Sequence, residues 1–202
     1  MGNLKTGIHD SVRTPEALLM EGVARQDMKS LEFVIRRFRP LVFRTALRIV
    51  CSTDEAEDIT QETFIRVWRH AGRYDSRYSI RTWLYRIASN LALDHLRRRR
   101  LFRIRLPDVI TGRAGNAGIP EEKSAEEKLI MDEDWKAFIR ISEKLSPKQR
   151  LVLTLRDIEG LDTEQVAEIT GMSADQIKSN LFQARRKVKD MLGRKRHIPT
   201  RK

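Results

Sequence analysis

Aromatic and arginine side chains alternate between residues 73 and 86 of this 202-residue chain, and four consecutive arginines follow at positions 97–100. Unpaired bases stack on aromatic rings while guanidinium groups neutralise phosphates, so this pattern is typical of a surface that binds single-stranded nucleic acid. An alternative is that the apolar side chains of this segment pack in a hydrophobic core. Helical spacing favours the core for at least Leu84, Ile87 and Leu91.

Acidic side chains gather in the segment just before it. Helical spacing between residues 54 and 68 places four polar residues on one face: Asp54, Asp58, Gln61 and Glu62. Three interpretations are open, namely the carboxylate metal site of a nuclease, a solvated face, and a docking surface for a basic partner protein. No histidine is spaced to complete a set of metal ligands and no activated nucleophile lies nearby, which argues against the nuclease. A charged face of this kind would orient and steer a partner.

The last third of the chain carries helix-capping and turn residues in the order typical of a helix-turn-helix DNA-binding motif. Asp162 is placed to cap a short helix, and Gly171 is placed to make the tight turn after it. Ser173 and Gln176 form a capping-box pattern at the start of a longer helix, which we expect to end with Gly193 as its C-cap. An ordinary helical hairpin with a basic surface is the alternative.

The longer helix divides into an apolar stripe and a polar face. The stripe, which we predict to pack inward, contains Ile177, Leu181, Ala184 and Val188. The outward face contains Lys178, Ser179, Phe182, Gln183 and Arg186. An exposed phenylalanine gains nothing in water, whereas in a DNA groove it can touch a thymine methyl group beside side chains that meet bases and phosphates. Residues 173–202 hold ten Lys and Arg against two Asp, a net charge of +8 that favours salt-sensitive binding to a polyanion.

Helical periodicity dominates the chain and no alternating strand pattern is visible. We therefore predict an all-α fold of two small helical domains joined by a flexible linker. Pro40 falls inside the helical stretch from about Asp27 to Val50 and is expected to kink or divide it. The predicted organisation is a disordered N-terminus (1–13), a first domain (14–102), a linker (103–130), a second domain (131–193) and a basic tail (194–202).

Composition limits the classes of function. The formal net charge of +12 favours a polyanionic partner, with simple solubility as the alternative. Cys51 is the single cysteine, which excludes an intramolecular disulfide and a CxxC-type metal site. No apolar run approaches the roughly 18 residues of a membrane span, and the N-terminus lacks a secretory core. We therefore expect no membrane insertion and a cytoplasmic setting.

Several segments, in order along the chain, resemble a known family. Asp54–Trp68 resembles region 2.2 of bacterial RNA polymerase sigma factors, specifically the extracytoplasmic-function (ECF) group, whose members have only regions 2 and 4. Thr82–Asn90 and Asp94–Arg98 resemble regions 2.3 and 2.4 of that group. Leu145–Arg150 and the helix-turn-helix resemble region 4. The resemblance covers about residues 14–192 and implies the same two-domain helical fold.

The resemblance implies roles for three sets of residues. Core RNA polymerase would be bound at its β′ clamp helices by Asp58, Gln61 and Glu62, with its β flap as a further contact. Minus-ten promoter DNA would be melted and captured by Tyr74, Tyr78, Ile80, Trp83, Asn90, Arg97 and Arg98. Duplex minus-thirty-five DNA would be read by Lys178, Ser179, Phe182, Gln183, Arg185 and Arg186, with Arg185 on a phosphate. The resemblance also implies an anti-sigma factor as a partner, no cofactor or metal, and no catalytic residue in the chain itself.

Some features depart from that family or stay open. Asn180 and Gln183 stand where many relatives carry arginine, so the duplex sequence read here is expected to differ. Ile80 replaces a frequent aromatic residue, which leaves the minus-ten preference open. A transcriptional regulator that uses the helix-turn-helix alone is the alternative function, and the metal nuclease is the enzyme alternative. The two domains either fold together and hide both DNA-binding faces or stay apart.

Overall fold

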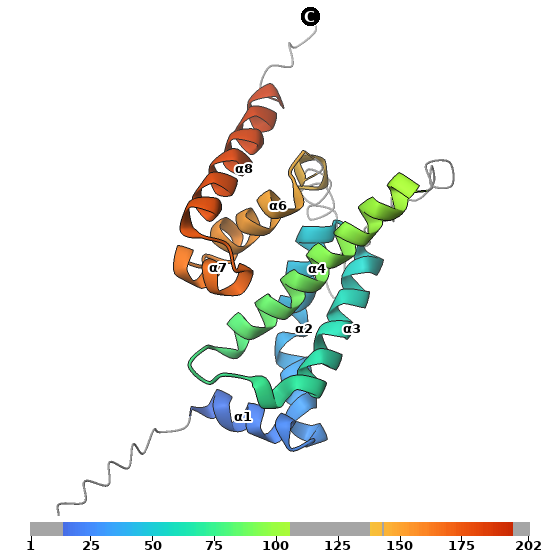
Figure 1. Cartoon of the computed structure of the whole chain (residues 1–202), viewed down its shortest axis with the longest axis vertical. Helices are drawn as coiled ribbons and strands as arrows, with labels where there is room; N and C mark the ends of the chain where they lie inside the picture. The colour runs from blue at the N-terminus through green and yellow to red at the C-terminus, as the bar shows by residue number, and fades with distance from the viewer. Residues whose placement is uncertain (1–13, 106–137, 143, 196–202) are drawn as a thin grey trace, which may run out of the picture.

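The computed structural model describes residues 14–105, 138–142 and 144–195, which form helices joined by short turns (Figure 1). The elements are α1 (Pro15–Ala24), α2 (Met28–Val50), α3 (Thr53–His70), η1 (Ala71–Arg73), α4 (Ile80–Arg105), α6 (Pro147–Leu153), η2 (Thr154–Ile158), α7 (Thr163–Thr170) and α8 (Ala174–Lys195). Residues 138–142 are also helical. No strand occurs in these ranges, which confirms the all-α class. Within the same ranges, no helix is both long enough and apolar enough to cross a membrane.

Two helices extend further than the sequence predicted. α4 continues to Arg105, into the segment predicted as a linker, and α8 continues to Lys195. Gly193 therefore lies inside α8, and its prediction as the C-cap is wrong. The predicted N-terminal segment, the rest of the predicted linker and the rest of the predicted tail lie outside the described residues.

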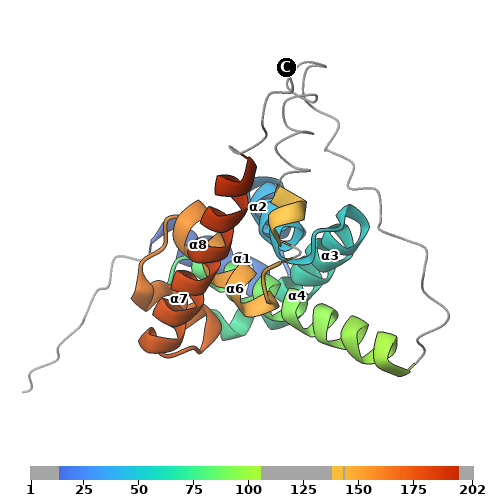
Figure 2. The ribbon, with the colours of Figure 1, turned by 90° about the horizontal axis from the view of Figure 1, so that it is seen from above.

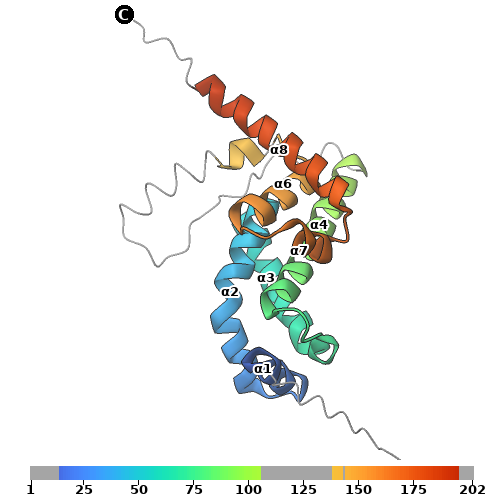
Figure 3. The same ribbon diagram turned by 90° about the vertical axis from the view of Figure 1, so that its left-hand side faces the viewer.

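The first domain is a bundle of α2, α3 and α4 with α1 across one end. Thr14, Asp27 and Ser52 each place a side-chain oxygen on a backbone N–H in the first turn of α1, α2 and α3, which starts these helices. The three long helices run in alternating directions, and α1 lies at the end where α2 begins (Figures 1 and 3). Their shared core is fully buried and includes Val34, Ala46, Ile49, Ala56, Val67, Leu84 and Ala88.

Pro40 does not divide α2, which is one helix from Met28 to Val50. Proline has no backbone N–H, so the carbonyl group of Arg36, four residues earlier, loses its helical partner. Both residues are exposed, so water can hydrate this carbonyl group. Of the two predicted outcomes, division of the helix is excluded.

Reciprocal capping boxes begin the helices of the second domain. At α6, Ser146 Oγ accepts the N–H of Gln149 while Gln149 Oε1 accepts the N–H of Ser146. Similar boxes start from Asp162 at α7 and from Ser173 at α8. Gly171 adopts a φ of +69° between α7 and α8, a left-handed conformation that glycine adopts without strain. The predicted caps and the predicted tight turn are therefore confirmed.

The second domain packs against α2 and α4 of the first, and buried apolar residues of both domains form one continuous cluster. Glu159, just after η2, is the polar centre of this contact. Its Oε1 lies 2.5 Å from Arg48 Nη1, and its Oε2 accepts a 2.7 Å hydrogen bond from Tyr85 Oη. Tyr85 is only 1% exposed, and burial raises its pKa to about 12, so the hydroxyl stays protonated and donates at physiological pH.

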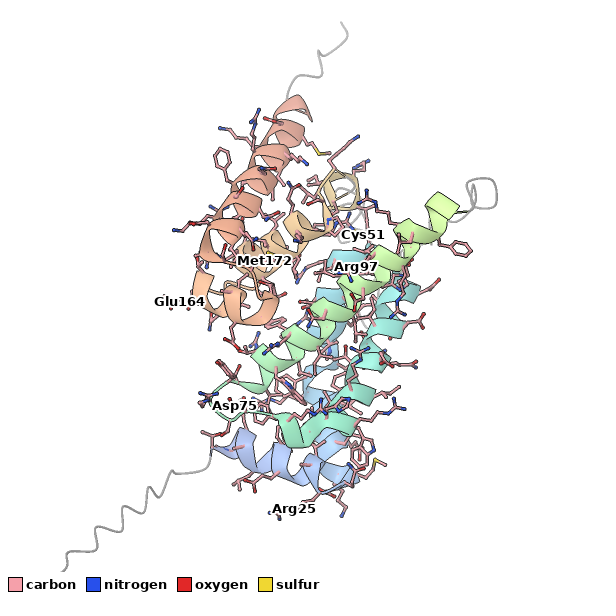
Figure 4. All side chains as sticks on the ribbon, in the orientation of Figure 1. Arg25, Cys51, Asp75, Arg97, Glu164 and Met172 are labelled. Carbon is pink, nitrogen blue, oxygen red and sulfur yellow. The ribbon has the colours of Figure 1, made fainter. Side chains whose placement is uncertain are left out.

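Two further polar contacts join the domains. Arg150 of α6 donates to the backbone carbonyl of Ile49 at 2.6 Å and lies 3.3 Å from the sulfur of Cys51, a residue labelled in Figure 4. Arg86 of α4 lies 3.6 Å from Glu168 of α7. The sequence did not decide whether the two domains pack together or stay apart. In the structure they pack together.

Replacing Glu159 with alanine is expected to loosen the contact between the domains, because it removes the acceptor that α2 and α4 share. A hydrogen bond to a charged group contributes about 1.5–3 kcal/mol, so the equilibrium constant between the closed and open arrangements should fall by about tenfold or more. Cys51 lies at this contact beside Arg150, so its rate of modification by a thiol reagent reports opening. We expect Glu159→Ala to react several-fold faster than the wild type.

The matched control is Glu164→Ala, which removes an exposed carboxylate of α7 away from this contact (Figure 4). It should leave the modification rate unchanged. Equal rates for wild type and Glu159→Ala would show that Glu159 does not hold the domains together.

Candidate nucleic-acid interface

α8 presents the predicted duplex-reading side chains on its exposed side. We call this set the recognition face: Lys178, Ser179, Phe182, Gln183 and Arg186. The predicted inward stripe is buried at Ile177, Leu181 and Ala184 and half-buried at Val188. Phe182 is 68% exposed, the largest fraction for any big apolar side chain in the described part of the chain. α8 lies at the outer edge of the molecule, so the recognition face is open although the domains lie together (Figures 1 and 2).

Arg185 is exposed but bound within the second domain. Its Nε and Nη2 lie 2.9 and 2.6 Å from the two carboxylate oxygens of Asp157 in η2. Hydrogen bonding to this carboxylate raises the pKa of Arg185. The bidentate pair ties α8 to η2. The expected phosphate contact therefore requires Arg185 to share its guanidinium with Asp157 or to leave it.

Gln183 also has partners inside the domain. Its Oε1 accepts a 3.0 Å hydrogen bond from Nε2 of Gln149, the capping-box residue of α6. Oε1 of Gln149 in turn accepts from the backbone N–H of Ser146 at 3.1 Å and from Lys187 Nζ at 3.0 Å. A short hydrogen-bonded chain therefore connects the start of α6 to the recognition face.

The loop between η1 and α4 fixes the positions of three aromatic rings. The rings of Tyr74 and Trp83 have centroids 5.5 Å apart, and Tyr74 Oη donates to the carbonyl of Tyr78 at 2.6 Å. Tyr74 and Trp83 are half-buried, whereas Tyr78 is exposed. Burial raises the pKa of Tyr74, which keeps its hydroxyl a donor. Asp75, labelled in Figure 4, binds the guanidinium of Arg77 in the same loop.

The other residues predicted to meet minus-ten DNA divide into exposed and buried ones. Asn90, Arg97 and Arg98 are exposed on α4. Ile80 is fully buried in the first turn of α4, where its backbone N–H donates to Glu16 at 3.2 Å. The side chain of Ile80 belongs to the core, so it is not part of the surface that the other predicted residues form. We call the other six predicted residues, which are exposed or half-buried, the α4 surface: Tyr74, Tyr78, Trp83, Asn90, Arg97 and Arg98.

α3 lies beside α4 and carries the acidic face defined by Asp54, Asp58, Gln61 and Glu62. The first three of these residues are exposed. Glu62 is half-buried, and its carboxylate accepts from Arg66 Nε at 2.9 Å one turn later. In residues 14–105, 138–142 and 144–195, no three His, Cys, Asp or Glu side chains are grouped to hold a metal ion.

Charges from α3 and α4 are also paired between the helices. Arg99 Nη1 lies 3.0 Å from the carboxylate of Glu55, and His95 Nε2 lies 3.3 Å from it. Part of the arginine run therefore binds α3 instead of facing outward. Arg97 lies 3.2 Å from Asp94 on α4 itself and remains exposed.

The three candidate surfaces lie on different sides of the molecule. α3 lies on the side of α4 opposite to α7, and Figures 1 and 2 agree on this placement. Glu159 contacts the buried Tyr85 of α4, and Glu168 of α7 contacts the exposed Arg86, both between Trp83 and Asn90 in the sequence. The second domain is therefore a direct neighbour of the α4 surface, while the acidic face and the recognition face point elsewhere.

Sequence reasoning missed the contact between the domains. Tyr85 was grouped with the aromatic residues that alternate with arginine, yet it is buried and binds Glu159. Its helical register with Ala88 and Ala92, which are both fully buried, was the available signal. No local pattern marks Glu159, because Tyr85 and Arg48 lie 74 and 111 residues away in the sequence.

Comparison with solved structures gives the same fold. The sigma factor RpoE from Bartonella quintana, solved in complex with the anti-sigma factor NepR, aligns with a TM-score of 0.64 and 22% sequence identity. The alignment covers 82% of this chain and 98% of that chain.

Comparison with family models and curated proteins identifies the family. The model for sigma-70 region 2 matches residues 34–102, and the model for sigma-70 region 4 matches residues 135–188. The RNA polymerase sigma-H factor of Pseudomonas aeruginosa is 30% identical over 84% of this chain and 90% of its own length. The ECF RNA polymerase sigma-E factor of Salmonella typhimurium is 30% identical over 88% of this chain and 94% of its own length. The chain therefore belongs to the sigma-70 family of RNA polymerase sigma factors, and within it to the extracytoplasmic-function group.

Proposed function

We propose that this chain directs core RNA polymerase to promoters by joining one polymerase-binding face to two DNA-binding surfaces. The observation that carries the proposal is the pairing of α3 with α4, which supports an acidic face and a basic, aromatic surface on adjacent helices of one domain. Such a domain can hold polymerase and single-stranded DNA at the same time. The chain contributes binding alone, without a catalytic residue or cofactor, and acts in the cytoplasm where the polymerase performs the chemistry.

The acidic face is assigned to the β′ clamp helices of the polymerase. Asp58 and Gln61 are exposed and Glu62 lies beside them, so the face offers charge and hydrogen-bonding groups to a basic partner. Complementary charge steers the encounter and fixes the orientation of the bound domain. Single- or double-stranded DNA, which is itself acidic, is repelled from this side. A second contact with the β flap belongs to the same proposal.

The α4 surface is assigned to the minus-ten element. Extruding a base from a duplex costs a few kcal/mol, which a protein pocket must offset. Tyr74 and Trp83 are already held in ring contact, so little further ordering is needed when a base stacks beside them. Arg97 and Arg98 are exposed further along α4, where they can neutralise phosphates of the same strand.

The recognition face is assigned to the major groove of the minus-thirty-five element. A recognition helix enters that groove and contacts base edges with its exposed side chains. Gln183 can bind base edges, Lys178 and Arg186 carry positive charge toward bases or phosphates, and Phe182 can contact a thymine methyl group. The high exposure of Phe182 supports this assignment, because an apolar ring on a solvated face gains nothing from contact with water.

Promoter binding requires the domains to separate. Glu168 of α7 lies against Arg86, which stands on α4 between Trp83 and Asn90, so α7 obstructs a DNA strand that follows α4 over this stretch. We therefore include an opening step in the formation of the holoenzyme. Because a solved relative is bound to an anti-sigma factor, we also include an anti-sigma factor among the partners of this chain.

Run-off transcription with purified core polymerase on a promoter library tests the proposal. A sigma factor yields transcripts that depend on both promoter elements. A transcriptional regulator that uses the helix-turn-helix alone would bind duplex DNA tightly but give no promoter-specific transcript with core polymerase. That second result, with a control sigma factor active in the same assay, would refute the proposal.

Replacing Gln61 and Glu62 together with alanine is expected to weaken binding to core polymerase by about tenfold or more, because the acidic face loses two of its polar groups. Fluorescence anisotropy of the labelled chain with core polymerase measures this affinity. The unfolding temperature should change little, since neither side chain is buried. Glu164→Ala is the matched control and should bind normally. Wild-type affinity in the double variant would place the polymerase contact elsewhere.

Replacing Gln183 with alanine is expected to alter base preference at one position of the minus-thirty-five element by about 1–3 kcal/mol, because one base-edge contact is lost. Sequencing the DNA selected by the holoenzyme from a randomised library measures that preference. Uniform weakening across all sequences would instead place Gln183 on the DNA backbone.

A further inference from the structure

The amide of Gln183 has two unlike ends, and the end that faces DNA limits what it can read. The carbonyl oxygen accepts hydrogen bonds and the NH₂ group donates them. In the major groove guanine offers acceptors at N7 and O6, thymine offers O4, and cytosine offers the donor N4–H₂. The direction in which this amide points is therefore a determinant of base specificity.

Two groups that can only donate set the direction of the neighbouring amide of Gln149. The backbone N–H of Ser146 lies 3.1 Å from Gln149 Oε1, and the ammonium group of Lys187 lies 3.0 Å from the same oxygen. Neither group can accept a hydrogen bond, so this end of Gln149 must be its carbonyl. Lys187 is itself fixed by a second bond of 3.0 Å to the backbone carbonyl of Lys144.

The orientation of the Gln149 side-chain amide determines that of the Gln183 amide. With its carbonyl occupied by donors, Gln149 can offer only its NH₂ group to Gln183, 3.0 Å away. Gln183 must therefore accept through Oε1. Gln149 is only 6% exposed, so it is held inside the domain, whereas Gln183 is exposed.

We infer that Gln149 is a positioning residue for promoter recognition, which binds the carbonyl of Gln183 and leaves the NH₂ group of Gln183 for the groove. The inference rests on the proposed contact of the recognition face with minus-thirty-five DNA. In this orientation Gln183 donates to a base acceptor, such as N7 or O6 of guanine, O4 of thymine or N7 of adenine. Cytosine, which presents a donor, is disfavoured at that position.

Gln149→Glu inverts the chain of hydrogen bonds without removing the helix cap. Ser-x-x-Glu is itself a capping box, so the N–H of Ser146 and the ammonium group of Lys187 keep their acceptor. The second carboxylate oxygen then stands where the NH₂ group donated. Gln183 must turn its own NH₂ group toward that oxygen and its carbonyl toward the groove.

The test measures base preference in minus-thirty-five DNA selected by the holoenzyme from a randomised library. At the position where Gln183→Ala flattens the preference, Gln149→Glu is expected to shift selection toward cytosine, relative to guanine, by on the order of tenfold. Gln149→Met, which has no hydrogen-bonding amide, should broaden the preference at the same position without inverting it. Thermal unfolding of both variants verifies that each is folded.

Gln165→Glu is the matched control, because it changes the same residue type at the same place in the capping box of α7. It adds an equal negative charge, and the capping-box bonds of Gln165 join it to Asp162, which is not part of the recognition face. It should leave the base preference unchanged, which separates inversion of the Gln183 amide from a general effect of charge on DNA affinity.

Two failures are distinguishable. If Gln183→Ala alters no base preference, the proposed reading role of Gln183 fails, and the inference fails with it. If Gln183→Ala flattens the preference but a folded Gln149→Glu variant keeps the wild-type preference, the inference alone is overturned.

Discussion

The carboxylate of Glu159 binds two helices of the domain to which it does not belong, and the arrangement of the whole chain depends on this contact. A carboxylate that leaves water must recover hydrogen bonds from protein donors. Arg48 of α2 and Tyr85 of α4 supply them at 2.5 and 2.7 Å. The apolar cluster that joins the domains provides attraction without direction. Because both donors lie on the first domain, the carboxylate selects the docking position that reaches both of them.

The net charge of +12 does not show that acidic and basic side chains lie on different helices of the first domain. Glu55 of α3 binds Arg99 of α4, so the two helices neutralise part of their charge along their common edge. The charges that remain outward include the acidic face on α3 and the exposed pair Arg97 and Arg98 on α4. Under the proposed function, opposite charge on neighbouring helices would let one domain attract two partners and would disfavour their exchange, since an acidic face repels DNA.

The sequence predicted those features that local rules determine. Caps at Asp162 and Ser173 follow from side chains three residues away from their partners, and the all-α class follows from periodicity. Two local rules failed where the surroundings decided the outcome: α2 continues through the exposed Pro40, and α8 continues through Gly193. The burial of Tyr85 and its bond to Glu159 were not predicted, because non-local packing creates them. The capping box of Gln149 was predictable for the same local reason as the others, whereas its bond to Gln183 was not.

The closed arrangement affects the two proposed DNA-binding surfaces differently. The recognition face stays exposed on α8, whereas Glu159 and Glu168 of the second domain bind α4 at Tyr85 and Arg86. On the proposed assignment, the free energy that holds the domains together therefore opposes DNA binding at the α4 surface more than at the recognition face. A partner that binds the open arrangement better than the closed one removes this opposition, and by linkage DNA on the α4 surface strengthens the binding of that partner equally. The contact at Glu159 thus makes the proposed engagement of single-stranded DNA conditional on a partner, while the proposed duplex reading by α8 does not require the domains to separate.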